Sequence, residues 1–351
     1  MSYSEPGAWN NADAMYKLQF IKDSEFKYMY SIDNYEIPKA ERCSTAMGLY
    51  GAAAFTKRCT ESELEAFVFG GINTTFGGHM GKPSSEIITY QLQKTYKKNK
   101  VKIKIFPEKN MSGDIPKASY GAVLTQISEC KLALTGGIMK PYIVAKTGYE
   151  ILVNNCNIEE EKSVGTLHIL EFSPELDNFQ WVSKGEVMSP RAHHIAEYIK
   201  SIDHLAVLGG LSVTNSSKSP GTRLNVDPIL ISMTTFTVTS VIRYDPLYTM
   251  HISGASSIQV TDREILFFGG YSSEIVHQNR HMNAESNNVC LVKLADDYGS
   301  YTLFKKDLNC SGFSMSYVNR ISNVEDNHTL FLTLGTKKGH GVFSDDKPNR
   351  K

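Results

Sequence analysis

Short apolar runs that end in a pair of glycines recur along the chain. Each run holds four or five apolar, β-prone residues, which is typical of a fully buried inner strand of a sheet. The pairs are Gly70-Gly71, Gly136-Gly137, Gly209-Gly210 and Gly269-Gly270, and a worn copy, LFLTLGTKK, carries Gly335. Their spacing of roughly 60–73 residues indicates that one supersecondary unit repeats, with loops of different lengths.

Further strand-like segments surround each run. One lies upstream, as in PKASYGAVLT (116–125) and HISGASSIQV (251–260), and two lie downstream, as in TLHILEF (166–172) with FQWVSKG (179–185). Four strands per repeat is the pattern of a blade in a β-propeller. The sequence therefore predicts an all-β propeller with five visible repeats and five or six blades.

The two ends of the chain are expected to share one blade. The strand-like segments MYKLQFI (15–21) and FKYMYSID (26–33) have no glycine-pair hairpin of their own, and we expect them beside GVFSDD (341–346). Joining both ends in one blade would close the ring and remove the exposed sheet edges. The predicted organisation is a flexible 1–11, a single propeller over 12–345 and a flexible tail over 346–351.

Glycine pairs also occur in loops that bind the phosphates of nucleotides. A dinucleotide loop requires GxGxxG at the start of a helix, and a Walker loop requires GxxxxGK[ST]; neither occurs here. We therefore interpret the pairs as turns, where glycine permits positive φ and close packing near the central channel.

Composition narrows the class of protein. The 351 residues are 41% hydrophobic and 21% charged with zero formal net charge, so bulk charge favours no nucleic acid, membrane or acidic partner. The six cysteines form no CxxC pair, which argues against zinc fingers and dense disulfides. The polar N-terminus does not look like a secretory signal, and no apolar stretch is long enough to predict a membrane span. An intracellular, reduced protein is expected.

The third repeat carries the fullest motif. Trp181, then Pro190-Arg191, then His193-His194 lead to the glycine pair at 209–210, and this is the pattern of kelch repeats. The segment RAHHIAEYIKSIDHL (191–205) could be taken for a helix with metal-binding histidines. Its register with the other repeats instead predicts a strand, with the histidines as packing or capping groups.

Several stretches together resemble one kelch family, that of the second recombination-activating protein, the non-catalytic subunit of the V(D)J recombinase, and its transposon-encoded relatives. The resemblance begins with KKNKVKIKIFPEKNMSGDIPKASYGAVL (97–124), runs through LALTGGIMKP (132–141) and continues with the insertion from Met139 to Val164. HISGASSIQVTDREILFFGGYSSEIVHQNRHMNAESNNVCLVKL (251–294), NHTLFLTLGTKKG (327–339) and PKAERCSTAMGLY (38–50) follow the family's order.

What this resemblance implies is a non-catalytic accessory subunit of a DNA transposase or recombinase. It would act in the nucleus and need no cofactor or metal of its own. It would bind and stabilise a separate catalytic subunit, in a two-plus-two assembly, and contact the DNA backbone near the cleavage site. Six blades are expected if the family pattern holds.

There are departures from the family and rival functions. Ala118 and Ala122 replace an arginine and a histidine of the family's second blade, and no cysteine follows Cys310, so a plant-homeodomain finger is not expected. These features fit a transposon-encoded relative better. The alternative is a propeller scaffold or substrate adaptor of a ubiquitin ligase. A propeller enzyme is disfavoured because the sequence has no GxSxG or HExxH motif and no evident Tyr/Cys/His set.

One strand carries the strongest local charge. Lys98, Lys100, Lys102 and Lys104 alternate with the apolar residues of KNKVKIKIF (98–106), and Lys97 precedes them. On a β-strand this alternation places the ammonium groups on one face and the apolar groups on the face toward the core. The lysines could guard a sheet edge against aggregation or contact phosphates. The resemblance to a recombinase subunit favours contact with phosphates, and all five lysines are then candidate DNA contacts.

Loops provide the other candidate surfaces, because binding residues concentrate in loops on rigid scaffolds. The insertion from Met139 to Val164 is apolar enough to pack against a partner. Asn215 to Asn225 and Ser272 to Asn288 are expected to be polar, mobile connections.

Overall fold

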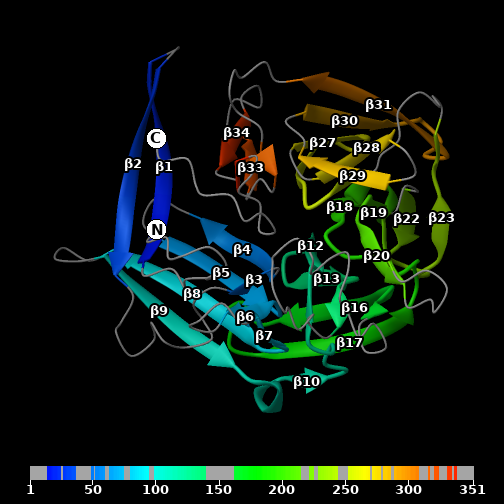
Figure 1. The fold of residues 1–351 in the computed structure, drawn as a ribbon. Coiled ribbons are helices and arrows are strands. Elements are labelled where there is room, and N and C mark those ends of the chain that lie inside the picture. Colours follow the sequence, from blue (N-terminus) through cyan, green and yellow to red (C-terminus); the bar gives the residue numbers. More distant parts are fainter. Residues whose placement is uncertain are drawn as a thin grey trace.

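In a computed structural model the chain forms antiparallel sheets around a common centre (Figure 1). The structure describes residues 14–24, 27–36, 49–50, 52–59, 63–74, 80–94, 99–139, 162–214, 221–224, 228–243, 252–268, 271–277, 280–285, 288–307, 315–316, 320–323, 330–333 and 336–337. Within these ranges the regular elements are strands, apart from short 3₁₀ turns such as η1 (Glu108–Asn110) and η3 (Lys200–Ile202). The expected all-β class is confirmed.

Four sheets each contain four antiparallel strands that follow one another in order, and we call them blades one to four. Blade one consists of β4 (Ala53–Cys59), β5 (Glu63–Phe69), β8 (Ile87–Lys94) and β9 (Asn99–Phe106). Blade two consists of β12 (Val123–Ser128), β13 (Lys131–Thr135), β16 (Thr166–Phe172) and β17 (Phe179–Glu186). Blade three consists of β18 (Ile195–Ile199), β19 (His204–Leu208), β22 (Ile229–Ser232) and β23 (Val238–Ser240). Blade four consists of β26 (Ser256–Thr261), β27 (Glu264–Phe268), β30 (Asn288–Leu294) and β31 (Ser300–Asp307).

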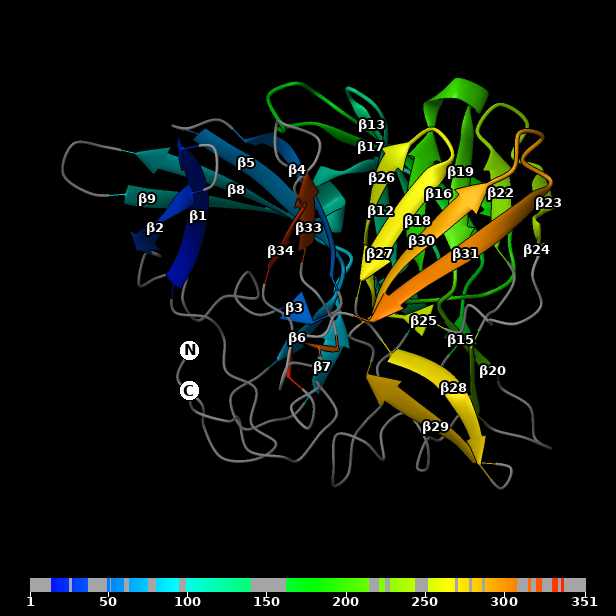
Figure 2. The same cartoon turned by 90° about the horizontal axis from the view of Figure 1, so that it is seen from above.

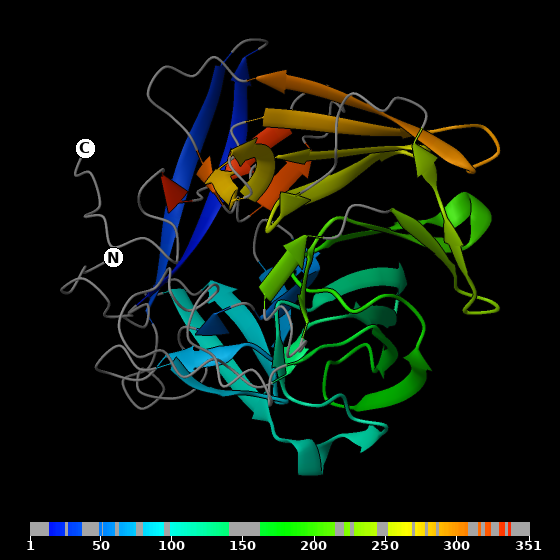
Figure 3. The same cartoon turned by 45° about the vertical axis from the view of Figure 1, so that its right-hand side comes forward.

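The first strands of the blades lie next to one another. β4 contacts β12, β12 contacts β18, and β18 contacts β26. β26 then contacts β33 (Arg320–Asn323), which pairs with β34 (Leu330–Thr333) in a hairpin. These strands surround the centre of the molecule, and the later strands of each blade lie farther out (Figures 1 and 3). A radial arrangement of four-stranded sheets is the architecture of a propeller.

Apolar layers between neighbouring blades form the core. Phe67 and Phe69 of blade one pack with Phe179 and Trp181 of blade two. A second layer joins blades two and three, and a third joins blades three and four. Aromatic edges strengthen the first layer, where the rings of Phe69 and Trp181 lie 4.9 Å apart between centroids. Because both faces of blades two and three are covered, their middle strands are continuous apolar runs rather than alternating ones.

The chain leaves each blade after its second strand and forms a small separate sheet before it returns. Small sheets combine β3 (Leu49–Tyr50), β6 (Ile72–Thr74) and β7 (Met80–Pro83), and likewise β11 (Ser119–Tyr120), β14 (Ile138–Met139) and β15 (Lys162–Ser163). Others combine β20 (Leu211–Thr214) with β21 (Gly221–Leu224), and β25 (Ile252–Ser253) with β28 (Tyr271–His277) and β29 (Arg280–Glu285). These small sheets lie on the same side of the blades (Figure 2).

Short parallel strands flank the outer strand of three blades. β10 (Ser112–Gly113) lies beside β17 of blade two, and β24 (Ile242–Arg243) lies beside β31 of blade four. On blade one, β2 (Lys27–Glu36) takes this place through the pair Glu36 and Lys100. β2 forms a hairpin with β1 (Ala14–Ser24). The hairpin stands beside β33 and β34 (Figures 1 and 3).

The expected terminal segments 1–11 and 346–351, and the strand GVFSDD (341–346), lie outside the described residues. In the part of the chain that the structure describes, no helix is long and apolar enough to cross a membrane.

Candidate nucleic-acid interface and its surroundings

Strand β9 carries the lysine alternation, and its register fixes which way each residue faces. Lys102 pairs with Gln91 and Lys104 pairs with Thr89 on β8. Residues that pair directly across a sheet project on the same face. Because Thr89 in turn pairs with Phe67, the lysines lie on the face of blade one that packs against blade two.

This finding corrects the expected direction of the alternation. Ile103 and Ile105 project on the opposite face and are only partly covered, with Ile105 37% exposed. Both faces of the middle strands are buried, since Phe67 on one face and Ile88 on the other are at most 1% exposed. The lysines are exposed because β9 is the outer strand, and not because their face of the sheet is turned to solvent.

Lys102 and Lys104 are exposed and make no hydrogen bond or ion pair within the described residues. Residues two apart on a strand are separated by about 6.7 Å, so the two ammonium groups can contact successive negative charges of an extended polyanion. Two acids flank this strand: Glu36 of β2 pairs with Lys100, and Glu65 lies in the cross-strand row of Lys102 and Gln91. The carboxylate of Glu65 accepts a hydrogen bond from Gln91 at 3.1 Å. Lys100 lies in the same strand, and Lys97 and Lys98 lie outside the described residues.

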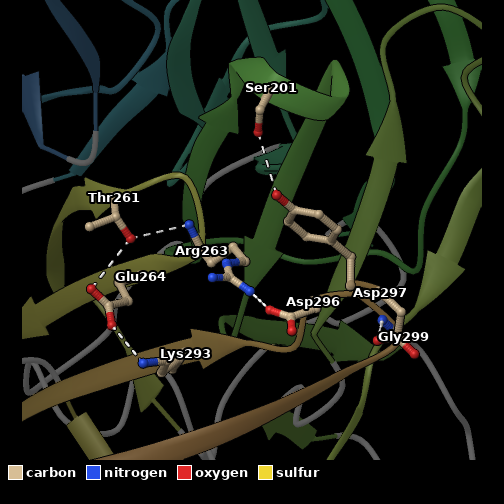
Figure 4. A network of polar contacts seen from close by, with 9 residues as sticks. Ser201, Thr261, Arg263, Glu264, Lys293, Asp296, Asp297 and Gly299 are labelled. Atoms are coloured by element: carbon tan, nitrogen blue, oxygen red, sulfur yellow. Dashed lines mark hydrogen bonds and ion pairs between the residues drawn. The ribbon is translucent and has the colours of Figure 1, made fainter.

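Some charged side chains elsewhere are paired, as at the turns of blade four (Figure 4). Arg263 bonds to Asp296, and Lys293 lies 3.3 Å from a carboxylate oxygen of Glu264. On blade two, Lys131 and Glu171 lie 2.6 Å apart. Lys131 and Lys293 are neutralised locally, whereas Lys102 and Lys104 have no such pair within the described residues and lie in one row on one strand. This arrangement makes the β9 lysines the candidate contact for an anionic partner.

The glycine pairs occupy the step from a blade into its small sheet. Both glycines have positive φ at 70–71, 136–137 and 209–210. The amide of Gly71 donates to the carbonyl of Ser119, and that of Gly137 donates to the carbonyl of Arg191, in each case on the segment that enters the next blade. A Cβ on Gly136 would lie 2.2 Å from the carbonyl oxygen of Arg191. Gly269 and Gly270 lie outside the described residues.

The Arg-His motif of the third repeat is built into the contact between blades two and three. Arg191 is 1% exposed and donates to the hydroxyl of Ser189 at 2.6 Å and to the carbonyl of Gly209 at 3.4 Å. Nε2 of His194 lies 2.8 Å from the hydroxyl of Thr135 on blade two. The backbone of His193 bonds to Gly121 on one side and Gly254 on the other, at 2.7 and 2.8 Å.

Both histidines are neutral at physiological pH. Burial lowers the pKa of His193 to about 4. Burial, followed by the positive charge of Arg191 and by repulsion from the protonated form of His193, holds the pKa of His194 well below its usual value. Among the described residues no group of three or more His, Cys, Asp or Glu could hold a metal ion. The motif leads into a strand, β18, and not into an α-helix, as its register predicted.

A partly buried acid lies at a position that the sequence patterns did not single out. Glu197 of β18 accepts a 2.6 Å hydrogen bond from Ser257 of β26, and burial raises the pKa of its carboxyl group. It lies between Ile195 and Ile199, which both belong to the core layer of blades three and four. A charged residue at an apolar position of a strand was the signal that could have revealed it.

The expected loops differ in outcome. Most of Ser272 to Asn288, expected as a loop, forms the antiparallel pair β28 and β29, in which Ile275 lies opposite Met282. Within Asn215 to Asn225, Gly221–Leu224 forms β21. The central part of the insertion, 140–161, lies outside the described residues, and its last residues form β15.

Comparisons with known proteins support the fold. No family model matches the sequence. No curated protein matches it either. Among solved structures, "Structure of YjhT", a kelch-repeat propeller, matches with a TM-score of 0.56 and 16% identity over 94% of this chain and 86% of that one. The Malassezia sympodialis allergen Mala s 1 matches with a TM-score of 0.40 and 11% identity over 93% and 85%. The first of these matches, together with the radial four-stranded sheets, shows that the chain has the fold of a kelch-type β-propeller.

Proposed function

We propose that this chain is a non-catalytic accessory subunit of a DNA transposase or recombinase, which acts in the nucleus. A separate catalytic subunit performs cleavage and strand transfer, and this propeller binds and stabilises it in a two-plus-two assembly. The sequence resemblance over most of the chain supports the class, and the propeller fold is compatible with it. The observation that carries the DNA contact is that Lys102 and Lys104 are exposed and have no ion-pair partner among the residues that the structure describes.

The lysine strand contributes sequence-independent affinity in this proposal. Each phosphate that a lysine neutralises releases counterions and changes the slope of log Kobs against log salt by about −0.9. A strand in which Lys98, Lys100, Lys102 and Lys104 all engage phosphate contributes a slope of about −3.6. The contact guides the complex on DNA and reads no bases, since phosphate contacts position a protein without specifying sequence.

Removing the two described lysines tests this contact. We expect K102Q/K104Q to weaken duplex DNA binding by the full chain and to make the salt slope shallower by about 1.8. The matched control is K131Q/K293Q, which removes the same charge from lysines that already pair with Glu171 and Glu264. Fluorescence anisotropy over a salt series gives both slopes. Equal slopes of log Kobs against log salt for the two double variants would show that the β9 lysines only protect the edge of the sheet.

The partner is tested separately. Affinity purification of the chain from its native cells, with mass spectrometry of the associated proteins, should recover a large protein with a transposase-type catalytic core. Recovery of a cullin-type ligase in its place would contradict the proposed class and favour an adaptor. The small sheets after the glycine pairs lie on the same side of the blades (Figure 2), and we assign the docking of the catalytic subunit to that side.

We also infer that the ring has five blades and that both ends of the chain build the last one. β2 lies beside β9 as β10 lies beside β17 and β24 beside β31. β24 follows β23, the outer strand of the preceding blade, as β10 follows β9. By the same repeat, β1 and β2 are the outer strands of a blade whose inner strands are β33 and β34. The contact of β33 with β26 supports this arrangement.

A further inference from the structure

The outer edge of blade three differs from that of the other three described blades. β17 and β31 are each flanked by a two-residue parallel strand, and β9 is flanked by β2 through one residue pair. The sheet of blade three ends at β23, with no strand beside it among the described residues. A position that the repeat fills in blades one, two and four is thus not filled in blade three by any strand of the described ranges.

The length of the connections explains the difference. Residues 107–118 join blade one to the inner region of blade two and have room to form β10 on the way. Residues 241–251 likewise provide β24 between blades three and four. Between blades two and three only residues 187–191 are available, and the amides of Val187 and Met188 both bond to the carbonyl of Gly165. This short connection turns inward at once and cannot reach the outer edge of blade three.

The register shows which backbone groups the open edge offers. The amide of Ser232 donates to the carbonyl of Thr237, and the amide of Val241 donates to the carbonyl of Pro228. In an antiparallel ladder these hydrogen-bonded pairs alternate with pairs that face outward. The N–H and C=O groups of Val238 and Ser240 therefore point away from β22 and have no partner within the described residues.

The side chains along this edge fit an apolar, uncharged contact. Val238 is 37% exposed, and Ile242, just beyond the strand, is 72% exposed. Thr239 and Ser240 are also exposed and carry no charge. Sheet edges in proteins are usually blunted by lysine, proline or a covering element, and the described residues of this edge have none of these.

We propose that the outer edge of blade three is a docking site for an extended peptide from another protein, which adds to β23 as a parallel strand. The flanking strands of blades two and four provide the template for its direction and short length. Backbone hydrogen bonds to Val238 and Ser240 hold the peptide, and an apolar side chain packs beside Val238 and Ile242. This is β-augmentation, in which main-chain bonds give affinity and side chains give selectivity. The site is independent of the proposed DNA contact.

Hydrogen exchange on the full chain tests whether the outward N–H groups of β23 are free. In the free protein we expect the amides of Val238 and Ser240 to exchange freely, and those of Thr239 and Val241 to be protected by β22. Protection of Val238 and Ser240 in the free chain would show that another part of the chain, or a second copy, already covers the edge, and would overturn the proposal.

Selection from a display library of random peptides tests the binding. Proline at 240 removes an outward N–H without breaking the ladder to β22, and edge positions of this kind tolerate proline. Selected peptides should bind S240P about tenfold or more weakly than the wild type, bind S240A as well as the wild type, and slow exchange at Val238 and Ser240. A library that yields no binder, or binders that S240P leaves unaffected, would overturn the proposal. If S240P folds poorly, slower exchange at Val238 and Ser240 of the wild-type chain with bound peptide still tests the site.

Discussion

At the scale of single residues, the glycine pairs show how one amino acid allows two blades to approach each other. Gly136 has φ +63° and lies where a Cβ would meet the carbonyl of Arg191 at 2.2 Å. Gly210 similarly leaves room for His194, whose Cβ would lie 2.7 Å from a side chain at that position. Glycine is required there for its conformation and for the space it leaves, and the second reason involves residues far away in the sequence.

Alanine substitutions separate these two reasons. G185A meets no atom within 4 Å but retains φ +78°, so we expect only the backbone strain of about 1 kcal/mol. G136A adds a steric overlap with Arg191 and should cost about 3 kcal/mol or more in the free energy of unfolding. Urea unfolding followed by circular dichroism compares them. Equal losses would show that the neighbouring blade yields easily at this contact.

At the scale of elements, side-chain hydrogen bonds join the first strands of neighbouring blades. The hydroxyl of Thr125 on β12 donates to the carbonyl of Ala196 on β18 at 2.9 Å. The next contact around the ring joins Ser257 on β26 to Glu197 on β18. The second contact places an ionisable group between two blades, where burial favours its neutral form.

This acid should make stability depend on pH. Its pKa in the folded state is raised, so the unfolded chain releases the proton first, and stability falls as pH rises through the unfolded value toward the folded one. E197Q keeps a hydrogen-bonding group for Ser257 and removes the charge, so its melting temperature should exceed that of the wild type at pH 7 and approach it near pH 4. Thermal melts at both values check this. If the difference in melting temperature between E197Q and the wild type were the same at both pH values, the pKa of Glu197 would not differ between the folded and the unfolded state.

At the scale of the whole molecule, two exposed apolar side chains indicate where the proposed closing blade would pack. Ile105 of blade one and Phe304 of blade four are 37% and 53% exposed within outer strands. Their register places Ile105 opposite Ile88 and Phe304 opposite Leu291, on the faces that point away from blades two and three. These two faces are the flanks between which the closing blade is expected.

Truncation tests the closing blade. Removal of residues 1–36 takes away β1 and β2, exposes both flanks and should lower the melting temperature by about 10 °C or more, because closure of a propeller protects its sheet edges. Removal of residues 1–11 alone is the control and should change it little. If both truncations melt like the full chain, the N-terminal hairpin is no part of the ring.

The sequence by itself determined the repeating unit and the strands within it. Apolar runs such as 132–135 and 205–208 predicted the second strand of each blade, because local β-propensity and glycine turns depend on neighbours in sequence. The alternation of lysines in β9 and the strand that follows Arg191 were also predictable from the sequence. These features need only the short-range geometry of a pleated chain.

Only the tertiary structure decided which face each strand presents to which neighbour. The lysines of β9 share a face with Phe67, Glu197 faces blade four, and β23 has an open edge, because blades pack on both sides and the connections between them differ in length. Such facts depend on pairing between residues distant in the chain, and alternation along one strand cannot reveal them.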